Sequence, residues 1–206
     1  MFDEKQLTAL RAKVSEGMSP KRFFHTAEVE KMVERLGALY CPNEIPMLRA
    51  AALLHDVTKE YSAEKQLKIL LDFGINVSKQ DILTPKTFHA KTAALLIPVE
   101  YAEFADPALI SAVRYHTTGR ADMTLPEKLL YLADYIDESR TFPDCVKLRE
   151  MFFGKEPEKM GEEKRLSHLD RVLVASFDMT VAGLLADGAI ISEDTVAARN
   201  FLLAGL

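Results

Sequence analysis

Helix-start signals recur along this 206-residue chain, and they constrain its fold more than any other feature. Ser19 and Asp106 each stand before a proline, which pairs a capping side chain with the residue best suited to the first helical position. Thr124 and Glu127 have the spacing of a capping box. Apolar residues follow these signals at helical spacing, and no stretch shows the alternation of a β-strand. The sequence therefore predicts an all-α fold.

The same signals, together with glycines that end helices, divide the chain into successive helical segments. We expect helices over residues 7–17, 20–40, 43–60, 62–74, 78–83, 85–97, 106–116 and 124–140, then a short helix, a long one ending near 186 and a last one after 192. Residues 18–140 are expected to form a core. Residues 1–17 would add an N-terminal helix, and residues 141–206 would pack on the core as C-terminal helices of the same structural domain.

Composition argues against several classes of protein. Hydrophobic residues make up 48% of the chain, which suits a packed core and argues against disorder. The net charge of −5 argues against binding of a nucleic acid polymer, because such proteins present a basic face. The N-terminus is charged from Asp3 and no apolar run is long enough for a membrane span, so we expect neither signal peptide nor membrane contact. Cys41 and Cys145 lack Cys-x-x-Cys spacing, which favours a reducing compartment, and we expect a cytoplasmic protein.

The five histidines fall into two groups. His168 lies in a polar context. The other four lie beside large apolar or aromatic residues and are expected to point inward: His25, His55, His89 and His116. Each of them, taken alone, has an ordinary explanation as a hydrogen-bonded or surface side chain.

Three aspartates accompany these histidines. Asp56 follows His55 directly, at the end of an apolar run. Asp134 lies at the edge of the apolar stripe of its helix, where a carboxylate is costly to bury unless a cation or a donor meets it. Asp137 competes with Asp134, but its polar neighbours favour a solvated helix end. Inward imidazoles with carboxylates suit a divalent metal, whereas a helical protein can also scatter four histidines by chance. Spacing alone leaves both interpretations open.

Resemblance to a known family adds to the pattern. The order His25, His55-Asp56, Asp134 resembles the H…HD…D pattern of HD-domain metal-dependent phosphohydrolases. The further histidines between the HD pair and the last aspartate resemble those of HD proteins that bind two metals. Successive stretches are similar to the YqeK family of bacterial symmetrical bis(5′-nucleosyl)-tetraphosphatases: KRFFHT, LLHDVTKE, TFHAKTA, YHTTGR and LADYIDESRTFPD. The resemblance spans residues 20–148.

The resemblance implies an HD-domain helical bundle with additional C-terminal helices, in which residues 18–140 form the phosphohydrolase core. One metal would be held by His25, His55, Asp56 and Asp134. Asp56 would bridge to a second metal, which His89 and His116 would complete. The family implies iron, whereas the donor set also suits Mn, Zn or Ni, and Mg stays open. It also suggests a homodimer.

The implied reaction is symmetrical hydrolysis of diadenosine tetraphosphate to two ADP by a hydroxide that bridges the metals. Asp56 and Lys59 would be the catalytic residues. The leaving nucleoside diphosphate needs charge neutralisation, and basic residues near the ligands are candidates to bind its phosphates: Arg22, Lys59, Arg120 and Arg140. Their ordinary alternative is a solvated surface charge.

Further substrate contacts are predicted in two places. Thr117, Thr118 and Gly119 form a turn whose backbone can approach a phosphate closely, although a plain helix C-cap explains the same residues. Tyr135 is a candidate to stack on a base, as is Phe142, and both also suit core packing.

Two other functions share part of this pattern. Another HD-domain phosphohydrolase, acting on nucleoside mono- or diphosphates, would have the same metal ligands. A regulatory module that binds nucleotides without turnover would show lost ligands, and none of the six is lost here. Assay products separate the first alternative from the proposed reaction.

Overall fold

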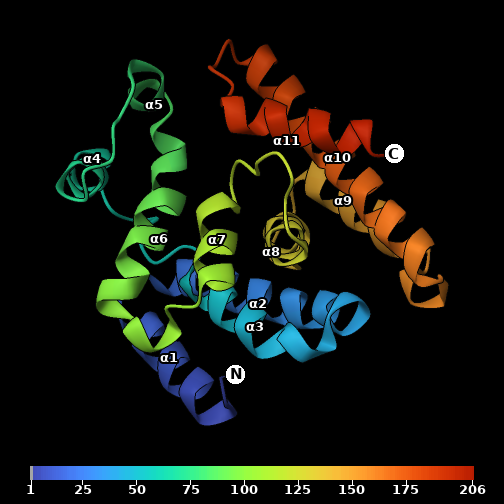
Figure 1. Cartoon of the computed structure of the whole chain (residues 1–206), viewed down its shortest axis with the longest axis horizontal. Helices are drawn as coiled ribbons and strands as arrows, with labels where there is room; N and C mark the ends of the chain where they lie inside the picture. Colours follow the sequence, from blue (N-terminus) through green and yellow to red (C-terminus); the bar gives the residue numbers. More distant parts are fainter. Residues whose placement is uncertain (1) are drawn as a thin grey trace.

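Helices account for all the regular structure in the computed structural model, which describes residues 2–206. Eleven α-helices and four short 3₁₀ helices occur in that range, without a strand, and this confirms the all-α prediction (Figure 1). The α-helices are α1 (Glu4–Glu16), α2 (Pro20–Tyr40), α3 (Ile45–Leu54), α4 (Ala63–Asp72), α5 (Lys79–Leu83), α6 (Phe88–Glu100), α7 (Pro107–Tyr115), α8 (Leu125–Ile136), α9 (Pro143–Phe153), α10 (Glu162–Ala186) and α11 (Glu193–Ala204). None of the described helices combines the length and apolarity needed to cross a membrane.

The predicted caps operate as expected. The Ser19 hydroxyl accepts from the Arg22 amide at the start of α2, and the Asp106 carboxylate accepts from two amides at the start of α7. Thr124 and Glu127 form the reciprocal capping box of α8. Several boundaries differ from the prediction. The 3₁₀ turns at Pro42–Glu44 and Pro85–Thr87 delay the starts of α3 and α6, and α3 and α8 end earlier than expected, at Leu54 and Ile136.

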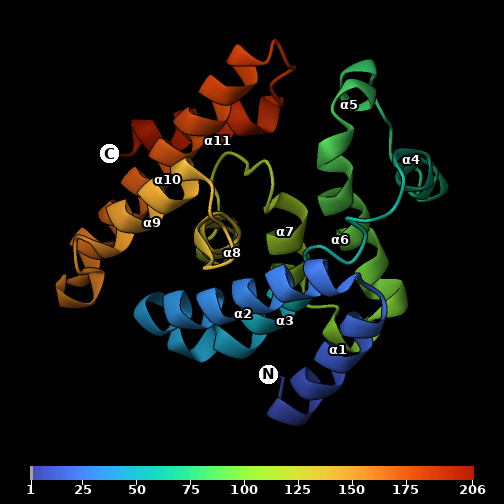
Figure 2. The same cartoon turned by 180° about the vertical axis from the view of Figure 1, so that it is seen from behind.

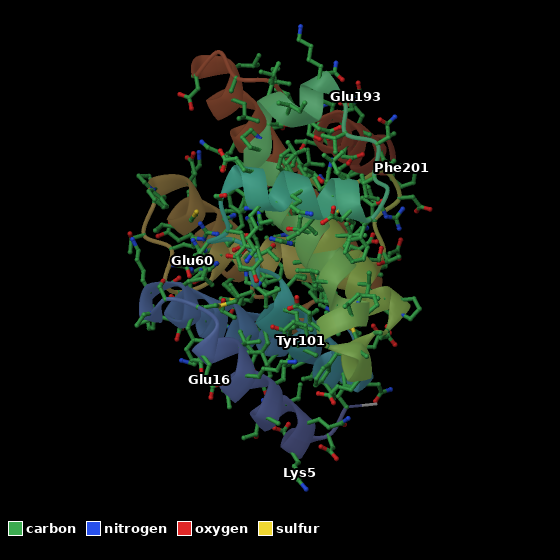
Figure 3. All side chains as sticks on the ribbon, turned by 90° about the vertical axis from the view of Figure 1, so that its left-hand side faces the viewer. Lys5, Glu16, Glu60, Tyr101, Glu193 and Phe201 are labelled. Atoms are coloured by element: carbon green, nitrogen blue, oxygen red, sulfur yellow. The ribbon has the colours of Figure 1, made fainter. Side chains whose placement is uncertain are left out.

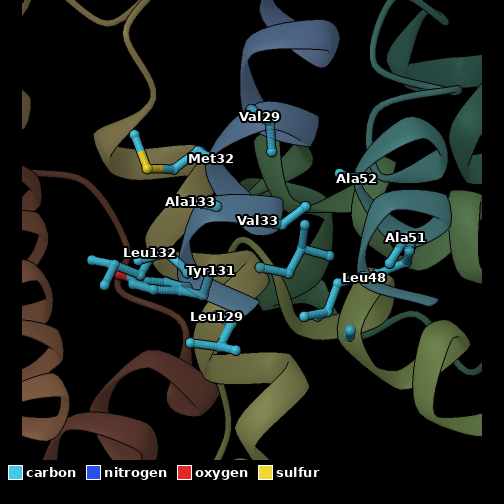
Figure 4. Packing of buried hydrophobic residues seen from close by; sticks show 14 of the residues in the cluster. Val29, Met32, Val33, Leu48, Ala51, Ala52, Leu129, Tyr131, Leu132 and Ala133 are labelled. Carbon is cyan, nitrogen blue, oxygen red and sulfur yellow. The ribbon is translucent and has the colours of Figure 1, made fainter. Parts of the chain in front are cut away.

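Helix α3 lies at the centre of the core and positions the functional site. Its sequence is apolar apart from Arg49, as expected of a largely buried helix, and it packs against α1, α2, α7 and α8. Small residues such as Ala51 and Ala52 let the neighbouring helices approach (Figure 4). Leu48 contributes to the same cluster as Val33 of α2 and Leu129 of α8. The chain that leaves α3 therefore enters the protein interior directly.

The remaining helices surround this centre. Helices α4, α5 and α6 lie on one side, and α9, α10 and α11 lie on the other, with α7 and α8 between them (Figures 1 and 2). Helix α1 lies at the opposite end of the molecule from α11, as the positions of Lys5 and Phe201 show (Figure 3).

Gly119, in the loop between α7 and α8, connects this loop to the C-terminal helices. Its φ of +62° is rarely adopted by residues with a side chain. A Cβ at this position would lie 2.6 Å from Cζ of Phe177 in α10 and 2.9 Å from Cβ of Ala198 in α11. The loop backbone can contact these helices because residue 119 has no side chain.

We expect Gly119→Ala to reduce the free energy of unfolding by about 2 to 4 kcal/mol, combining left-handed strain with overpacking. Gly74→Ala is the matched control, because Gly74 has a φ of +71° and a Cβ added there would meet no atom within 4 Å. The control should lose only the strain, about 1 to 2 kcal/mol. Urea unfolding of both variants measures the difference. Equal losses would contradict the contact between Gly119 and the C-terminal helices.

Candidate metal centre

Six side chains from five helices, or from the residues that directly follow them, meet in one buried cluster. His55 is the C-cap of α3, with Asp56 next in the chain, and His116 is the C-cap of α7. The structure brings together all six predicted ligands: His25, His55, Asp56, His89, His116 and Asp134.

The two carboxylate oxygens of Asp56 face different histidines. Oδ2 lies 3.5 Å from Nε2 of His55 and 3.9 Å from Nε2 of His25. Oδ1 lies 3.4 Å from Nε2 of His89 and 3.8 Å from Nε2 of His116. Asp56 therefore lies between two sets of imidazoles, as a residue that bridges two cations would.

Each set contains a second close contact. Oδ1 of Asp134 lies 2.9 Å from Nε2 of His25 and 3.9 Å from Nε2 of His55. The Nε2 atoms of His89 and His116 are 3.1 Å apart. Two triads have ligand atoms within 4.8 Å of one another, namely His25, His55 and Asp134, and His55, Asp56 and His116. The first contains three of the four ligands expected for one metal, whereas the second contains His55 where His89 is expected.

Backbone carbonyls orient three of the four rings. Nδ1 of His55 lies 2.6 Å from the Ala52 carbonyl oxygen, and Nδ1 of His116 lies 2.7 Å from that of Val113. Both carbonyls belong to the last turn of a helix, where no intrahelical amide follows to occupy them. His89 makes the equivalent contact with the Lys86 carbonyl at 2.9 Å. A carbonyl only accepts, so Nδ1 carries the proton and Nε2 keeps its lone pair for a ligand.

Burial and charge set the protonation of the centre. Burial lowers the pKa of His89 to about 4 and that of His116 well below its usual value, so both rings are neutral. Burial alone would raise the pKa of Asp56, but His55 and Lys59 outweigh it and hold the pKa well below its usual range. Against burial, Arg140 and His25 likewise lower the pKa of Asp134. Burial alone would lower the pKa of His25, but its contacts with Asp134 and Asp137 outweigh burial and raise the pKa to about 9. The centre thus offers two neutral imidazoles, His89 and His116, and ionised carboxylates.

A divalent metal fits these residues. Among the described residues, Nε2 of His55 and Oδ1 of Asp56 are buried without a hydrogen-bond partner. Leaving such atoms unsatisfied costs about 1 to 3 kcal/mol each, and a metal cation would satisfy both of them. Imidazole with carboxylate is a donor set typical of divalent transition metals.

Three of the predicted basic residues line the centre. Arg22 donates from Nη1 to Oδ2 of Asp56 at 2.6 Å, and Arg140 donates from Nη2 to Oδ1 of Asp134 at 2.6 Å. Nζ of Lys59 lies 3.0 Å from Nε2 of His89 and 3.9 Å from Oδ1 of Asp56. These side chains are about one-third exposed and link the buried ligands to solvent.

The turn after His116 approaches the centre through one residue. Oγ1 of Thr117 lies 3.1 Å from Nε2 of His89. Thr118 is buried and donates to the Gly119 carbonyl, and Gly119 contacts the C-terminal helices instead. Arg120 donates from Nε to Oε1 of Glu127 at 3.0 Å. Arg120 and Gly119 therefore hold the turn in place, and their contacts with a phosphate stay a prediction.

A cavity of about 560 Å³ adjoins the centre at Asp134 and Arg140. Tyr135 lines it, and its hydroxyl bonds to Thr180 at 2.7 Å. Phe142 also lines the cavity and has 66% of its surface exposed.

The predicted solvation of Asp137 is wrong, because this side chain is fully buried. Its carboxylate accepts from the Ser139 amide at 2.9 Å and from the Ser139 hydroxyl, and Oδ2 lies 3.4 Å from Nδ1 of His25. Aspartate followed two residues later by serine is a signal for such a turn and was available in the sequence. His168 lies outside the centre and contacts the Phe152 carbonyl.

We expect Arg120→Ala to reduce the free energy of unfolding by about 1 to 3 kcal/mol without loss of metal. Glu127 is fully buried, and after the substitution the Ser111 hydroxyl and the Thr124 amide would be left to meet its charge. Arg199→Ala is the control, because Arg199 pairs with the half-exposed Asp178 and should lose less than about 1 kcal/mol. Denaturant unfolding and metal analysis check both variants, and equal stabilities would contradict the assigned role of Arg120.

The chain is similar to known proteins along most of its length. Residues 22–139 match the family model described as HD domain. A bis(5′-nucleosyl)-tetraphosphatase, symmetrical, from Bacillus subtilis (strain 168) is 31% identical over 196 residues, which cover 93% of this chain and 95% of the relative. A protein of the same name from Halalkalibacterium halodurans is 30% identical over 188 residues, which cover 90% of this chain and 91% of the relative.

A solved structure is similar over the whole chain. It is a crystal structure from Clostridium acetobutylicum, described as a "predicted HD superfamily hydrolase involved in NAD metabolism". The two structures align with a TM-score of 0.83 and 27% sequence identity, covering 100% of each chain. The similarity therefore includes the C-terminal helices as well as the matched domain.

Proposed function

The chain belongs to the HD domain family, and we propose that it is a hydrolase that cleaves dinucleoside tetraphosphates symmetrically, yielding two ADP from diadenosine tetraphosphate. The observation that carries the proposal is the position of Asp56, whose two oxygens face separate sets of histidines. The substrate is supported by relatives named symmetrical bis(5′-nucleosyl)-tetraphosphatases, which align over nine-tenths or more of this chain.

The proposal includes two metal ions. His25, His55 and Asp134 would surround one, His89 and His116 the other, and Asp56 would contribute an oxygen to each. When bound, such ions lower the pKa of water and offset the negative charge of phosphoryl oxygens. Family resemblance favours iron, and the same donors suit Mn, Zn or Ni.

The basic residues at the centre are proposed to bind the polyphosphate. Arg22, Lys59 and Arg140 touch the metal ligands and are each partly exposed, so a bound phosphate can contact them from solvent. The Lys59 ammonium lies 3.0 Å from Nε2 of His89, and at this position it can offset the charge of the departing ADP. A nucleoside diphosphate is an acidic leaving group, so charge neutralisation by Lys59 matters more than proton transfer. The hydroxyl of Thr117, beside His89, can donate to the same phosphate.

The cavity beside Asp134 is proposed to hold a nucleoside. The proposal is supported by its lining, because Arg140 lies beside the metal centre and the aromatic Tyr135 and Phe142 line the same cavity. Stacking of a base on an aromatic ring contributes about 1 to 3 kcal/mol in nucleic-acid binding sites.

Product analysis tests the reaction. Metal-loaded enzyme should convert diadenosine tetraphosphate to ADP alone, resolved by ion-exchange chromatography. In ¹⁸O-labelled water, half of the ADP molecules should carry one heavy oxygen, because one water is added for every two products. Formation of ATP with AMP would contradict symmetrical cleavage.

The second candidate is an HD hydrolase of another nucleotide. The similar Clostridium structure is described as involved in NAD metabolism, which gives this alternative a specific basis. A panel of nucleoside mono- and diphosphates and pyridine dinucleotides, assayed beside diadenosine tetraphosphate, separates the two candidates. Turnover of the panel without turnover of the tetraphosphate would favour the second.

We expect Asp56→Ala to remove metal and activity together, because the substitution removes the two oxygens that face both sets of histidines. The loss of metal affinity should exceed about 100-fold, which is the upper end of the range for removing a residue that only supports a metal ligand. Metal analysis by mass spectrometry and turnover assays check the prediction, with the exposed Asp72→Ala as control. Full metal content in Asp56→Ala would contradict a bridging role.

A further inference from the structure

His25 is oriented differently from the other three histidines of the centre. Those three rings bond through Nδ1 to backbone carbonyls at or beside helix ends. His25 lies inside α2, where carbonyl oxygens already accept from amides four residues ahead. Its Nδ1 therefore requires a side-chain partner.

Asp137 and Ser139 supply that partner. Nδ1 of His25 lies 3.2 Å from Oγ of Ser139 and 3.4 Å from Oδ2 of Asp137. The Ser139 hydroxyl donates in turn to Oδ1 of Asp137. Asp137 has no exposed surface, and its Oδ2 is buried without a hydrogen bond among the described residues, so Nδ1 of His25 is one of two cationic nitrogens within 4 Å of it. Such a carboxylate is costly to bury without a role.

The backbone that carries Asp137 is held firmly. Asp137 is the C-cap of α8, and its carbonyl accepts from Nη2 of Arg149. Arg149 also donates to the carbonyls of Ile136 and Arg140. Nε of Arg140 lies 3.5 Å from Oδ2 of Asp137. The carboxylate is thus fixed in place beside His25.

We propose that Asp137, together with Ser139, is a positioning residue that keeps the proton of His25 on Nδ1 and directs the Nε2 lone pair to the metal centre. The inference rests on the proposed metal centre and adds a residue outside its six ligands. Carboxylate partners of this kind fix the tautomer of a metal-bound histidine and strengthen its donor nitrogen.

The Asp137→Asn substitution is the sharpest test of this role. The groups around the carboxylate are donors or cations. The Ser139 amide and hydroxyl donate to Oδ1, and Nδ1 of His25 and the Arg140 guanidinium lie 3.4 Å and 3.5 Å from Oδ2. An amide has one acceptor, and the Ser139 donors would hold it on their side. Its NH₂ would then face Nδ1 of His25 and favour the tautomer with the proton on Nε2, which cannot bind a metal.

The experiment measures Zn²⁺ affinity by chelator competition and the His25 tautomer by ¹⁵N NMR of the zinc-loaded protein. Asp137→Asn should bind zinc about 10- to 100-fold more weakly and shift the proton from Nδ1 to Nε2 of His25. Ser139→Ala should lose less affinity, because Oδ2 of Asp137 still faces the ring. Glu138→Gln is the matched control, since Glu138 is the exposed neighbour and its substitution removes the same charge, and it should match the wild type.

Each outcome bears on the proposal. Wild-type affinity with an unchanged tautomer in Asp137→Asn would overturn it and leave the metal centre intact. Absence of zinc from the wild-type centre would overturn the proposed metal centre itself. If Asp137→Asn does not fold, the zinc-loaded wild-type spectrum decides, because an unprotonated Nδ1 on His25 would overturn the proposal without any variant.

Discussion

The buried charge of Asp56 is the constraint on which the rest of the structure depends. It follows the most apolar helix of the core and is only 3% exposed, so its ionised form requires compensation. Arg22 from α2 and Lys59 from the loop after α3 bring cations to it, and imidazoles from α6 and α7 lie beside it. The polar centre therefore lies directly at the end of the most apolar helix of the core.

The placement of the histidines at helix ends meets two needs at once. The last turns of α3 and α7 leave carbonyls without intrahelical donors, and His55 and His116 supply those donors from Nδ1. The same bonds turn Nε2 of each ring toward Asp56. One hydrogen bond therefore both satisfies a backbone carbonyl and orients Nε2 of the ring. His25, in the interior of a helix, cannot use it, and a buried carboxylate takes the place of the carbonyl.

The sequence predicted those features that depend on local chemistry. Capping residues and prolines located most helices, since caps act within one turn, and apolar neighbours indicated which histidines point inward. The pairing of Arg120 with Glu127 joins the loop before α8 to the first turn of that helix, whereas the pairing of Asp137 with His25 depends on how α8 meets α2. Asp137 has polar neighbours in the sequence, and these favour a solvated side chain. Helical periodicity carries no signal for a contact between α8 and α2, so the sequence predicts a solvated Asp137. The phosphate contact of Arg120 stays a prediction.

The C-terminal helices contribute none of the six clustered side chains, yet they contact the loop that carries one of them. Gly119 lies three residues after His116 and touches Phe177 of α10 and Ala198 of α11. Thr117 lies between His116 and Gly119 in the chain, and its hydroxyl contacts His89. Close-packed interiors transmit displacements, so a shift of α10 or α11 would move the His116 turn with it. The geometry on the His89 side of Asp56 is thus set partly by helices distant in sequence, whereas the His25 side is set by α2 and α8.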